Sequence, residues 1–187
     1  MTVLETDRLL LRRLTGADVD DLAALDADRE VMRFITGGEP TPLAEIRDEV
    51  LPMLLREYDR VPGLGRFAAA ERSGGRFVGW FGLRPRDGFE AHEAELGYRL
   101  RREVWGRGYA TEGCRALVRR AFAELGLQRI SAQTMAVNVA SRRVLEKAGL
   151  TPVRVFHLRW RNPIPGTEQG EVEYALDRLT WERSIAT

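Results

Sequence analysis

The segment that decides the fold reads Trp105-Gly106-Arg107-Gly108-Tyr109-Ala110-Thr111-Glu112. It lies between a strand predicted over 93–100 and a helix predicted over 109–125. Glycines permit tight backbone paths and close approach of a ligand, and the unpaired N–H groups at the start of a helix attract phosphate oxygens. We therefore expect a pyrophosphate to bind here, although a plain strand-to-helix turn is the simpler alternative.

Two other phosphate-binding motifs can be compared with these letters. A Walker loop requires Gly-Lys-Ser/Thr, and the segment contains no lysine. A dinucleotide fingerprint requires Gly-x-Gly-x-x-Gly, and the position of its last glycine is Thr111. Neither motif fits the segment, so a mononucleotide-binding P-loop and a dinucleotide-binding turn are both disfavoured.

Strands and helices alternate along the chain in the predicted order β-α-α-β-β-β-α-β-α-β-β. Strands are expected over 3–14, 66–71, 76–83, 93–100, 129–134, 152–160 and 171–176. Helices are expected after the capping residues Thr15, Thr41 and Asn138, and over 109–125, with a kink at Pro52. This mixture predicts an α/β (α+β) domain over residues 1–187, with a largely antiparallel sheet and two crossover helices.

Composition excludes several classes of protein and site. The formal net charge of +1 provides no basic field for nucleic acid. The single cysteine, Cys114, rules out an intramolecular disulfide, and the isolated histidines His92 and His157 have no ligand-spaced partner, so no metal site is predicted. The chain shows neither a signal peptide nor a run of about 18 apolar residues. We therefore expect a cytoplasmic protein without membrane association.

Several segments together resemble the Gcn5-related N-acetyltransferase (GNAT) superfamily, in its RimJ/RimL-like branch, which contains ribosomal-protein N-terminal acetyltransferases. They occur in the family's order and spacing, and they are Leu4-Glu-Thr-Asp-Arg-Leu-Leu-Leu-Arg, Glu95-Leu-Gly-Tyr-Arg-Leu, Trp105-Gly-Arg-Gly-Tyr-Ala-Thr-Glu, Asn138-Val-Ala-Ser and Leu145-Glu-Lys-Ala-Gly-Leu. Gly108 and Ala110 match the last fixed positions of the family's loop pattern Arg/Gln-x-x-Gly-x-Gly/Ala. Trp105 stands where the family usually has Arg or Gln.

The resemblance implies a GNAT fold and acetyl-CoA as cosubstrate. The fold would be a mixed, mostly antiparallel central sheet of about seven strands with about four helices, in which splayed central strands form the acetyl-CoA cleft. The backbone near Leu100 would bind pantetheine and the thioester oxygen, and Asn138 would bond the pantetheine amide. The implied cofactor-binding residues are Leu100, Gly106, Arg107, Gly108, Tyr109, Ala110, Thr111 and Asn138.

The resemblance also suggests catalytic residues. Glu95 is the expected general base, with Glu93 on the same strand face in reserve. The alternatives are that both glutamates are solvated strand positions, or that backbone groups and water replace a dedicated base. Some members of the family have a tyrosine seven residues after the helix-capping Asn that protonates the leaving thiolate, and here that position is Leu145. We therefore expect Ser141, or less directly Tyr98, to face the leaving sulfur.

The implied reaction is acetylation of a primary amine. The RimJ/RimL-like branch favours a protein N-terminal α-amino group as acceptor, and a small-molecule amine is the alternative. A CoA-binding or regulatory GNAT domain with little turnover, and an acyl donor such as succinyl-CoA, are further alternatives. The protein is expected to be a monomer or a homodimer, with acetyl-CoA and the acceptor amine as its partners.

Overall fold

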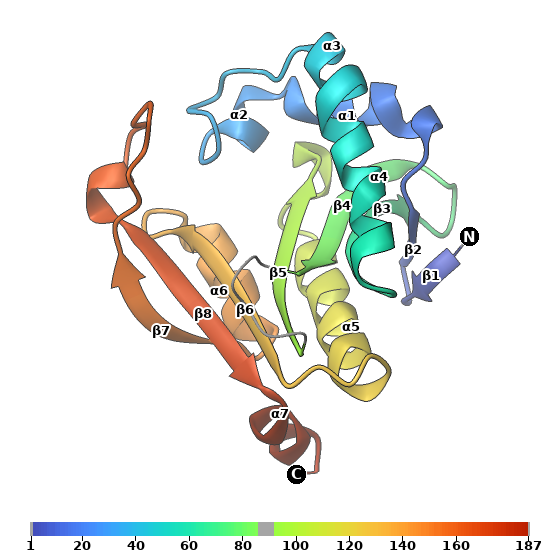
Figure 1. Ribbon diagram of the computed structural model, residues 1–187, viewed down its shortest axis with the longest axis vertical. Helices are drawn as coiled ribbons and strands as arrows, with labels where there is room; N and C mark the ends of the chain where they lie inside the picture. The colour runs from blue at the N-terminus through green and yellow to red at the C-terminus, as the bar shows by residue number, and fades with distance from the viewer. Residues whose placement is uncertain (1, 86–91, 187) are drawn as a thin grey trace.

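A single mixed sheet forms the centre of the computed structural model, which describes residues 2–85 and 92–186 (Figure 1). Within these residues the sheet has eight strands in the order β1-β2-β3-β4-β5-β6-β8-β7. The strands are β1 (Thr2–Glu5), β2 (Leu9–Arg13), β3 (Gly65–Glu71), β4 (Phe77–Arg84), β5 (Glu93–Leu100), β6 (Arg129–Met135), β7 (Thr151–Phe156) and β8 (Glu171–Asp177). Neighbours pair antiparallel except β5 and β6, which are parallel.

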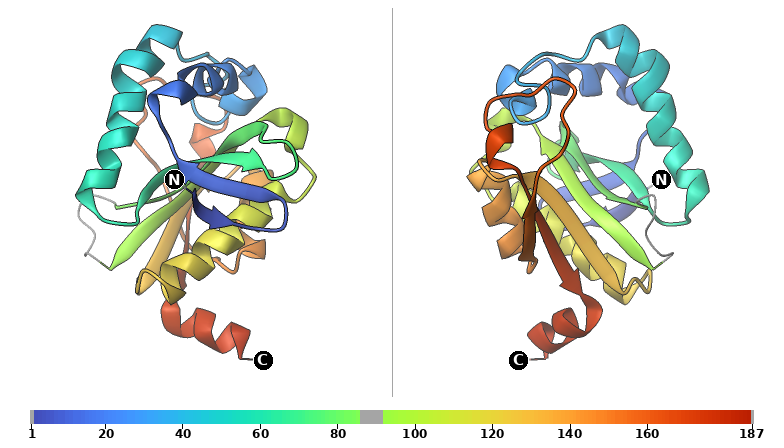
Figure 2. Two further views of the ribbon diagram at one scale, coloured as in Figure 1. Left: turned by 90° about the vertical axis from the view of Figure 1, so that its right-hand side faces the viewer. Right: turned by 60° about the vertical axis from the view of Figure 1, so that its left-hand side comes forward.

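Helices cover both faces of the sheet (Figure 2). The helical segments are η1 (Gly16–Asp18), α1 (Val19–Asp26), α2 (Arg29–Met32), α3 (Leu43–Glu45), the π-helical η2 (Ile46–Val50), α4 (Leu51–Arg60), η3 (Arg102–Val104), α5 (Tyr109–Ala123), α6 (Val139–Lys147), η4 (Thr167–Gln169) and α7 (Arg178–Ile185). Buried residues of α5 and α6, such as Leu117 and Leu145, pack in the larger core cluster. Buried residues of α1, η2 and α4, such as Leu25 and Leu54, pack in a second cluster with Ala68 and Phe77 of the sheet.

The parallel strands β5 and β6 separate soon after they begin. They pair only over Glu93–Glu95 and Arg129–Ser131. Beyond that point β5 remains paired with β4, and β6 remains paired with β8 along its full length. The divergence, visible in Figure 1, confirms the splayed central strands that the resemblance implied.

Side chains of β5 alternate between the two helical layers, as the sequence pattern predicts. Arg99 forms an ion pair with Asp26 of α1, on the layer of α1 to α4. Tyr98 lies near Ser141 of α6, on the layer of α5 and α6. Glu95 shares the face of Arg99, because residues two apart in a strand point the same way.

The structure differs from expectation at four places. The strand expected over 3–14 is two strands, because a turn at Thr6 intervenes, in which Leu9 N–H donates to Thr6 Oγ1 at 2.9 Å. The sheet therefore has eight strands rather than about seven. Pro52 lies at the start of α4, and the preceding turn widens into η2, since proline has no N–H to donate. The strand expected over 152–160 ends at Phe156, and α7 was not expected.

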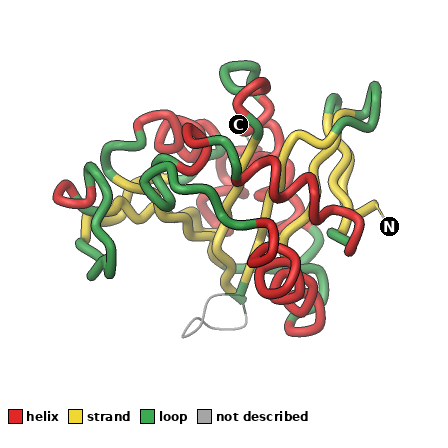
Figure 3. The backbone as a smooth tube through the Cα atoms, turned by 90° about the horizontal axis from the view of Figure 1, so that it is seen from above, coloured by secondary structure: helices red, strands yellow, loops and turns green. Residues whose placement is uncertain are grey.

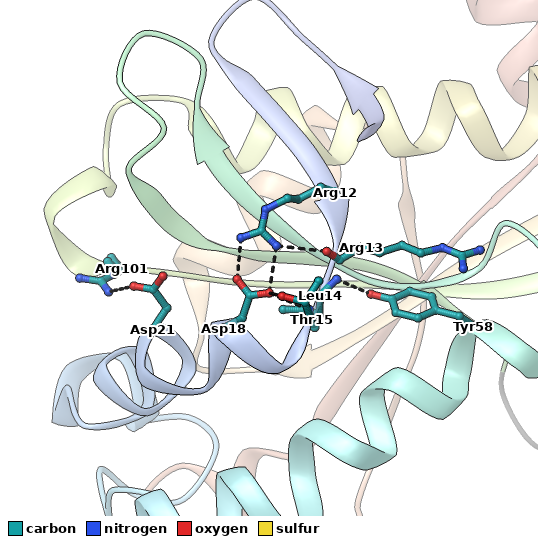
Figure 4. Close-up of polar contacts among 8 residues, drawn as sticks. All are labelled: Arg12, Arg13, Leu14, Thr15, Asp18, Asp21, Tyr58 and Arg101. Carbon is teal, nitrogen blue, oxygen red and sulfur yellow. Dashed lines mark hydrogen bonds and ion pairs between the residues drawn. The ribbon is translucent and has the colours of Figure 1, made fainter. Parts of the chain in front are cut away.

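The junction from β2 to α1 is held by charge-assisted hydrogen bonds (Figure 4). Arg12 donates to both carboxylate oxygens of Asp18, at 2.6 and 2.9 Å. The Thr15 N–H donates to Asp18 Oδ2 at 2.7 Å, which confirms the capping interaction expected there. Burial acts to raise the pKa of Asp18, but the hydrogen bonds from Arg12 and Thr15 bring it below its usual value. These contacts fix α1 and thereby position Asp26 against β5.

Candidate active site

A cleft of about 970 Å³ opens where β5 and β6 diverge. It is bounded by the loop before α5, the start of α6 and the segments from α1 to α4. Ten residues predicted from the sequence line this cleft: Glu95, Tyr98, Leu100, Gly106, Gly108, Tyr109, Ala110, Thr111, Asn138 and Ser141. Arg107 is not among the lining residues. The structure thus gathers one set of candidates from β5, the glycine loop and α6 around a single space.

The free edge of β5 faces the gap. The Arg101 N–H donates to Val78 O on β4 at 2.9 Å. Because backbone groups alternate in direction along a strand, those of Leu100 and Tyr98 point to the opposite side, where β6 no longer pairs with β5. The Leu100 carbonyl accepts a 2.9 Å hydrogen bond from Trp105 Nε1. An extended ligand can therefore pair with this edge as an added strand.

Trp105 has a structural role that the family pattern did not indicate. Its indole N–H joins the loop to the end of β5 through Leu100, although the side chain is about half exposed. The bond fixes the distance between the strand edge and the start of α5.

Glycines shape the loop that follows. Gly106 and Gly108 have φ of 71° and 82°, in the left-handed region that favours glycine. Gly108 is the N-cap of α5, so the loop ends where the unpaired N–H groups of the helix begin. Tyr109, Ala110 and Thr111 of this first turn line the cleft. The arrangement fits a pyrophosphate, since helix starts bind anions through these groups and the helix dipole.

Arg8 holds the loop from outside, and sequence reasoning did not single it out. Its Nη1 donates to Arg107 O at 2.8 Å, and its Nε donates to Glu112 Oε2 at 2.6 Å. Thr6 Oγ1 donates to Glu112 Oε1 at 2.6 Å. Burial acts to raise the pKa of Glu112, but the hydrogen bonds from Thr6 and Arg8 bring it below its usual value. Arg8 and Thr6 both belong to the family motif Leu4–Arg12, and this motif is the sequence feature that could have indicated their contacts with the loop.

Substitution of Gly108 by valine is expected to raise KM for acetyl-CoA about tenfold. A side chain there strains the backbone by about 1–3 kcal/mol and brings its Cβ within 3.3 Å of Arg8 Nη2, so the first turn of α5 shifts. Steady-state kinetics at varied acetyl-CoA would measure the change. Gly126→Val is the matched control: Gly126 also has a positive φ, of 71°, but it lies beyond the other end of α5. If Gly108→Val bound CoA with unaltered affinity, the assignment of this loop as the pyrophosphate-binding site would be refuted.

Tyr98 and Ser141, the two candidates for protonating the leaving thiolate, lie near each other on this face, and the Ser141 side chain acts on the pKa of Tyr98. Burial raises the pKa of Tyr98 above its ordinary value, and the Ser141 side chain only partly opposes this effect. The Ser141 N–H donates to Asn138 Oδ1 at 3.1 Å, which confirms Asn138 as the helix cap. The cap fixes Ser141 in the first turn of α6, so a protonated phenol and a hydroxyl share one wall of the cleft.

Glu95 lies on the opposite face of β5. Its Oε1 accepts a 2.8 Å hydrogen bond from Arg84 Nη2 on β4, and its side chain is 12% exposed. Glu93, the reserve candidate, does not line the cleft. Glu95 is therefore the better placed of the two to receive a proton from an amine.

Glu171, at the start of β8, is a second cleft-lining carboxylate, and the sequence pattern did not identify it. It is 5% exposed, and Oε1 has no hydrogen-bond partner among residues 2–85 and 92–186. Burial raises the pKa of Glu171. Nothing in the letters Gly170-Glu-Val-Glu distinguishes it from Glu173, which is paired with Arg154.

Glu171→Gln is expected to stabilise the protein by about 1 kcal/mol near pH 8. Because the folded-state pKa of Glu171 is raised, its ionisation costs stability as pH rises through that value. The gain should vanish below about pH 4, where the carboxyl is protonated in both states. Thermal unfolding at both pH values tests this, with Glu173→Gln as control. If the stability gain of Glu171→Gln persisted unchanged at low pH, it would not come from the ionisation of Glu171.

Parallel central strands that separate beside a glycine-rich helix start form the cleft that the resemblance implied for a coenzyme A-dependent acyltransferase. A sequence model described as acetyltransferase (GNAT) domain matches residues 8–151, and the chain belongs to this family. It is therefore an acetyl-CoA-dependent acyltransferase, as the sequence motifs predicted.

Relatives support this assignment. The chain is 38% identical over 189 residues to the FsC-acetyl coenzyme A-N(2)-transacetylase of Aspergillus fumigatus, with 96% of this chain and 78% of that protein covered. It is 27% identical to the "Putative ribosomal N-acetyltransferase YdaF" of Bacillus subtilis, with 94% of each covered. The crystal structure of a GNAT-family acetyltransferase from Bacillus anthracis has the same fold, with a TM-score of 0.77 at 24% identity over 96% of this chain and 99% of that one.

Two features are absent from the part of the chain that the structure describes. Within it, no three His, Cys, Asp or Glu side chains lie close enough together to hold a metal ion. No helix in that part has the length and apolar character needed to cross a membrane. Cys114 is fully buried, and burial raises the pKa of its thiol, which disfavours it as a nucleophile.

Proposed function

We propose that the chain is a single domain that transfers the acetyl group of acetyl-CoA to a primary amine. The observation that carries the proposal is the separation of β5 from β6 after three paired residues, next to the glycine loop. This separation leaves the strand edge near Leu100 open to the pantetheine arm and the first turn of α5 open to the pyrophosphate.

In the proposed reaction the amine nitrogen attacks the thioester carbon, a C–N bond forms and the C–S bond breaks. Glu95, directly or through water, takes the proton that the ammonium must lose. A backbone N–H near Leu100 stabilises the oxyanion. The nitrogen loses its second proton after the attack, and this proton passes to the leaving thiolate, which becomes the free thiol of CoA while Tyr98 and Ser141 donate hydrogen bonds to the sulfur.

Two acceptor classes have support. A protein N-terminal α-amine is favoured by the RimJ/RimL-like motifs and by the similarity to YdaF. A small-molecule amine is the second class; the relative at 38% identity is named as an N(2)-transacetylase, a name that mentions no ribosomal protein. Both classes present a primary amine to the same face of β5, where Glu95 lies.

The test is release of CoA thiol by the purified protein supplied with acetyl-CoA and a panel of amines. The panel should contain short peptides with free N-termini, the same peptides with blocked N-termini, and small mono- and diamines. Turnover of free but not blocked peptides would establish the α-amine as acceptor. Tight CoA binding without turnover across the whole panel would contradict the proposal and favour a CoA-binding regulatory domain.

A further inference from the structure

Glu171 occupies a position that the acetyl-transfer chemistry does not explain. It pairs with Met135 of β6 and Phe156 of β7, so it sits inside the sheet rather than at its edge. Its neighbours Val172 and Tyr174 point into the core with α6, where the Tyr174 hydroxyl donates to Glu146. Because successive side chains of a strand point to opposite faces, Glu171 lies on the other face of the sheet, which is the face of Glu95 and Arg99.

The other buried or half-buried acidic groups that line the cleft already have partners. Asp26 is paired with Arg99, and Glu95 with Arg84. Glu171 has no ion pair with any residue in the described ranges, and its Oε1 lacks a hydrogen-bond donor there. Burying a carboxylate without a partner costs several kcal/mol, so such a group in a cleft is suited to a ligand that brings the missing charge.

The sheet register gives the position of this carboxylate relative to the proposed base. Glu95 pairs with Ser131 of β6, and Glu171 pairs with Met135, four residues further along the same strand. At about 3.3 Å per residue along β6 and about 4.8 Å between neighbouring strands, the two residues are offset by about 13 Å along the strands and about 10 Å across them, which places their backbones about 16 Å apart. Apolar side chains, including Met135, Leu158 and Trp160, line the same cleft and suit a hydrocarbon chain.

We infer that Glu171 binds a second cationic group of the acceptor, an ammonium remote from the nitrogen that is acetylated. The inference rests on the proposed function, because it takes the reacting amine to lie near Glu95. It assigns the acceptor to amines that carry two cationic groups joined by an extended, largely apolar chain. Burial raises the pKa of Glu171, and a bound ammonium would act in the opposite direction and lower it.

The test compares linear α,ω-diamines of increasing length with the amino alcohols of the same length, which lack the second charge. Wild-type protein is expected to show kcat/KM at least tenfold higher for the best diamine than for its amino alcohol. Glu171→Gln should lower kcat/KM for that diamine about 10–100-fold, the range of a charge-assisted hydrogen bond. Its kcat/KM for the amino alcohol should change less than about threefold.

Glu173→Gln is the matched control, because Glu173 shares the sheet face but is paired with Arg154. It should retain the preference for the diamine. Equal losses for both substrates in Glu171→Gln, or an unchanged preference, would overturn the inference while the acetyltransferase function stands.

A binding measurement separates the two proposals. Calorimetric titration of the CoA-bound protein with the diamine should show binding to wild type that is lost in Glu171→Gln. If no amine is acetylated but this difference is found, the proposed function fails and the cation site remains. Absence of both turnover and diamine binding in the wild type would contradict both.

Discussion

Glu95→Gln is expected to lower kcat about 100-fold near neutral pH, the lower end of what a general base contributes. An acceptor amine is largely protonated at that pH, and the glutamine amide cannot take its proton. At high pH the amine loses its proton to solvent, so the deficit should shrink as pH rises. The measurement is the pH profile of kcat for both proteins with one acceptor at saturating acetyl-CoA.

Glu93, two residues before Glu95 on the same strand, provides a matched control for this experiment. Glu93→Gln removes the other acidic side chain on the same face of β5, which does not line the cleft, and should leave the pH profile unchanged. The loss of the partner of Arg84 costs little stability, because the Arg84 side chain is 44% exposed. If the pH profiles of kcat for wild type and Glu95→Gln ran parallel, Glu95 would not be the general base. Water or backbone groups would then have to accept the proton.

Local patterns predicted the centre of the fold well. The alternation of Glu93, Glu95 and Gly97 with Ala94, Leu96 and Leu100 predicted β5 with both ends correct. Glycines and a helical apolar stripe predicted the loop and α5, because periodicity and left-handed backbone positions are properties of neighbouring residues. The same alternation placed Tyr98 opposite Glu95, and the structure confirms the two faces.

Contacts between distant residues could not be predicted in this way. Arg8 reaches Arg107 across 99 positions of sequence, and the difference between Glu171 and Glu173 depends on whether Arg154 of another strand is near. Such contacts depend on the register of several strands, which one sequence does not specify. The helix α7 was missed because only Trp181 packs firmly, against Phe122 with ring centroids 5.3 Å apart, while Leu179 and Ile185 are exposed.

Gly113→Ala should destabilise the protein by about 2–3 kcal/mol, the upper part of the usual range for overpacking a core. In an exposed helix the same change would stabilise by up to about 1 kcal/mol. Here the added Cβ would lie 2.3 Å from the Phe81 ring, which is fully buried, so the ring or the helix must shift. Gly113 is therefore what lets α5 approach β4 closely enough to bring its first turn to the cleft. Urea unfolding would measure the loss.

A second substitution tests whether the clash with Phe81 is the cause. Phe81→Leu removes ring atoms that face Gly113, so Gly113→Ala in that background should cost less than about 1 kcal/mol, with the two changes coupled by more than about 1 kcal/mol. If the free-energy changes of Gly113→Ala and Phe81→Leu were additive, the destabilisation by Gly113→Ala would not come from the contact with Phe81. Because α5 carries the glycine loop at its start, Gly113→Ala should also raise KM for acetyl-CoA, and Phe81→Leu should reverse that rise, which links the packing of this helix to the geometry of the cleft.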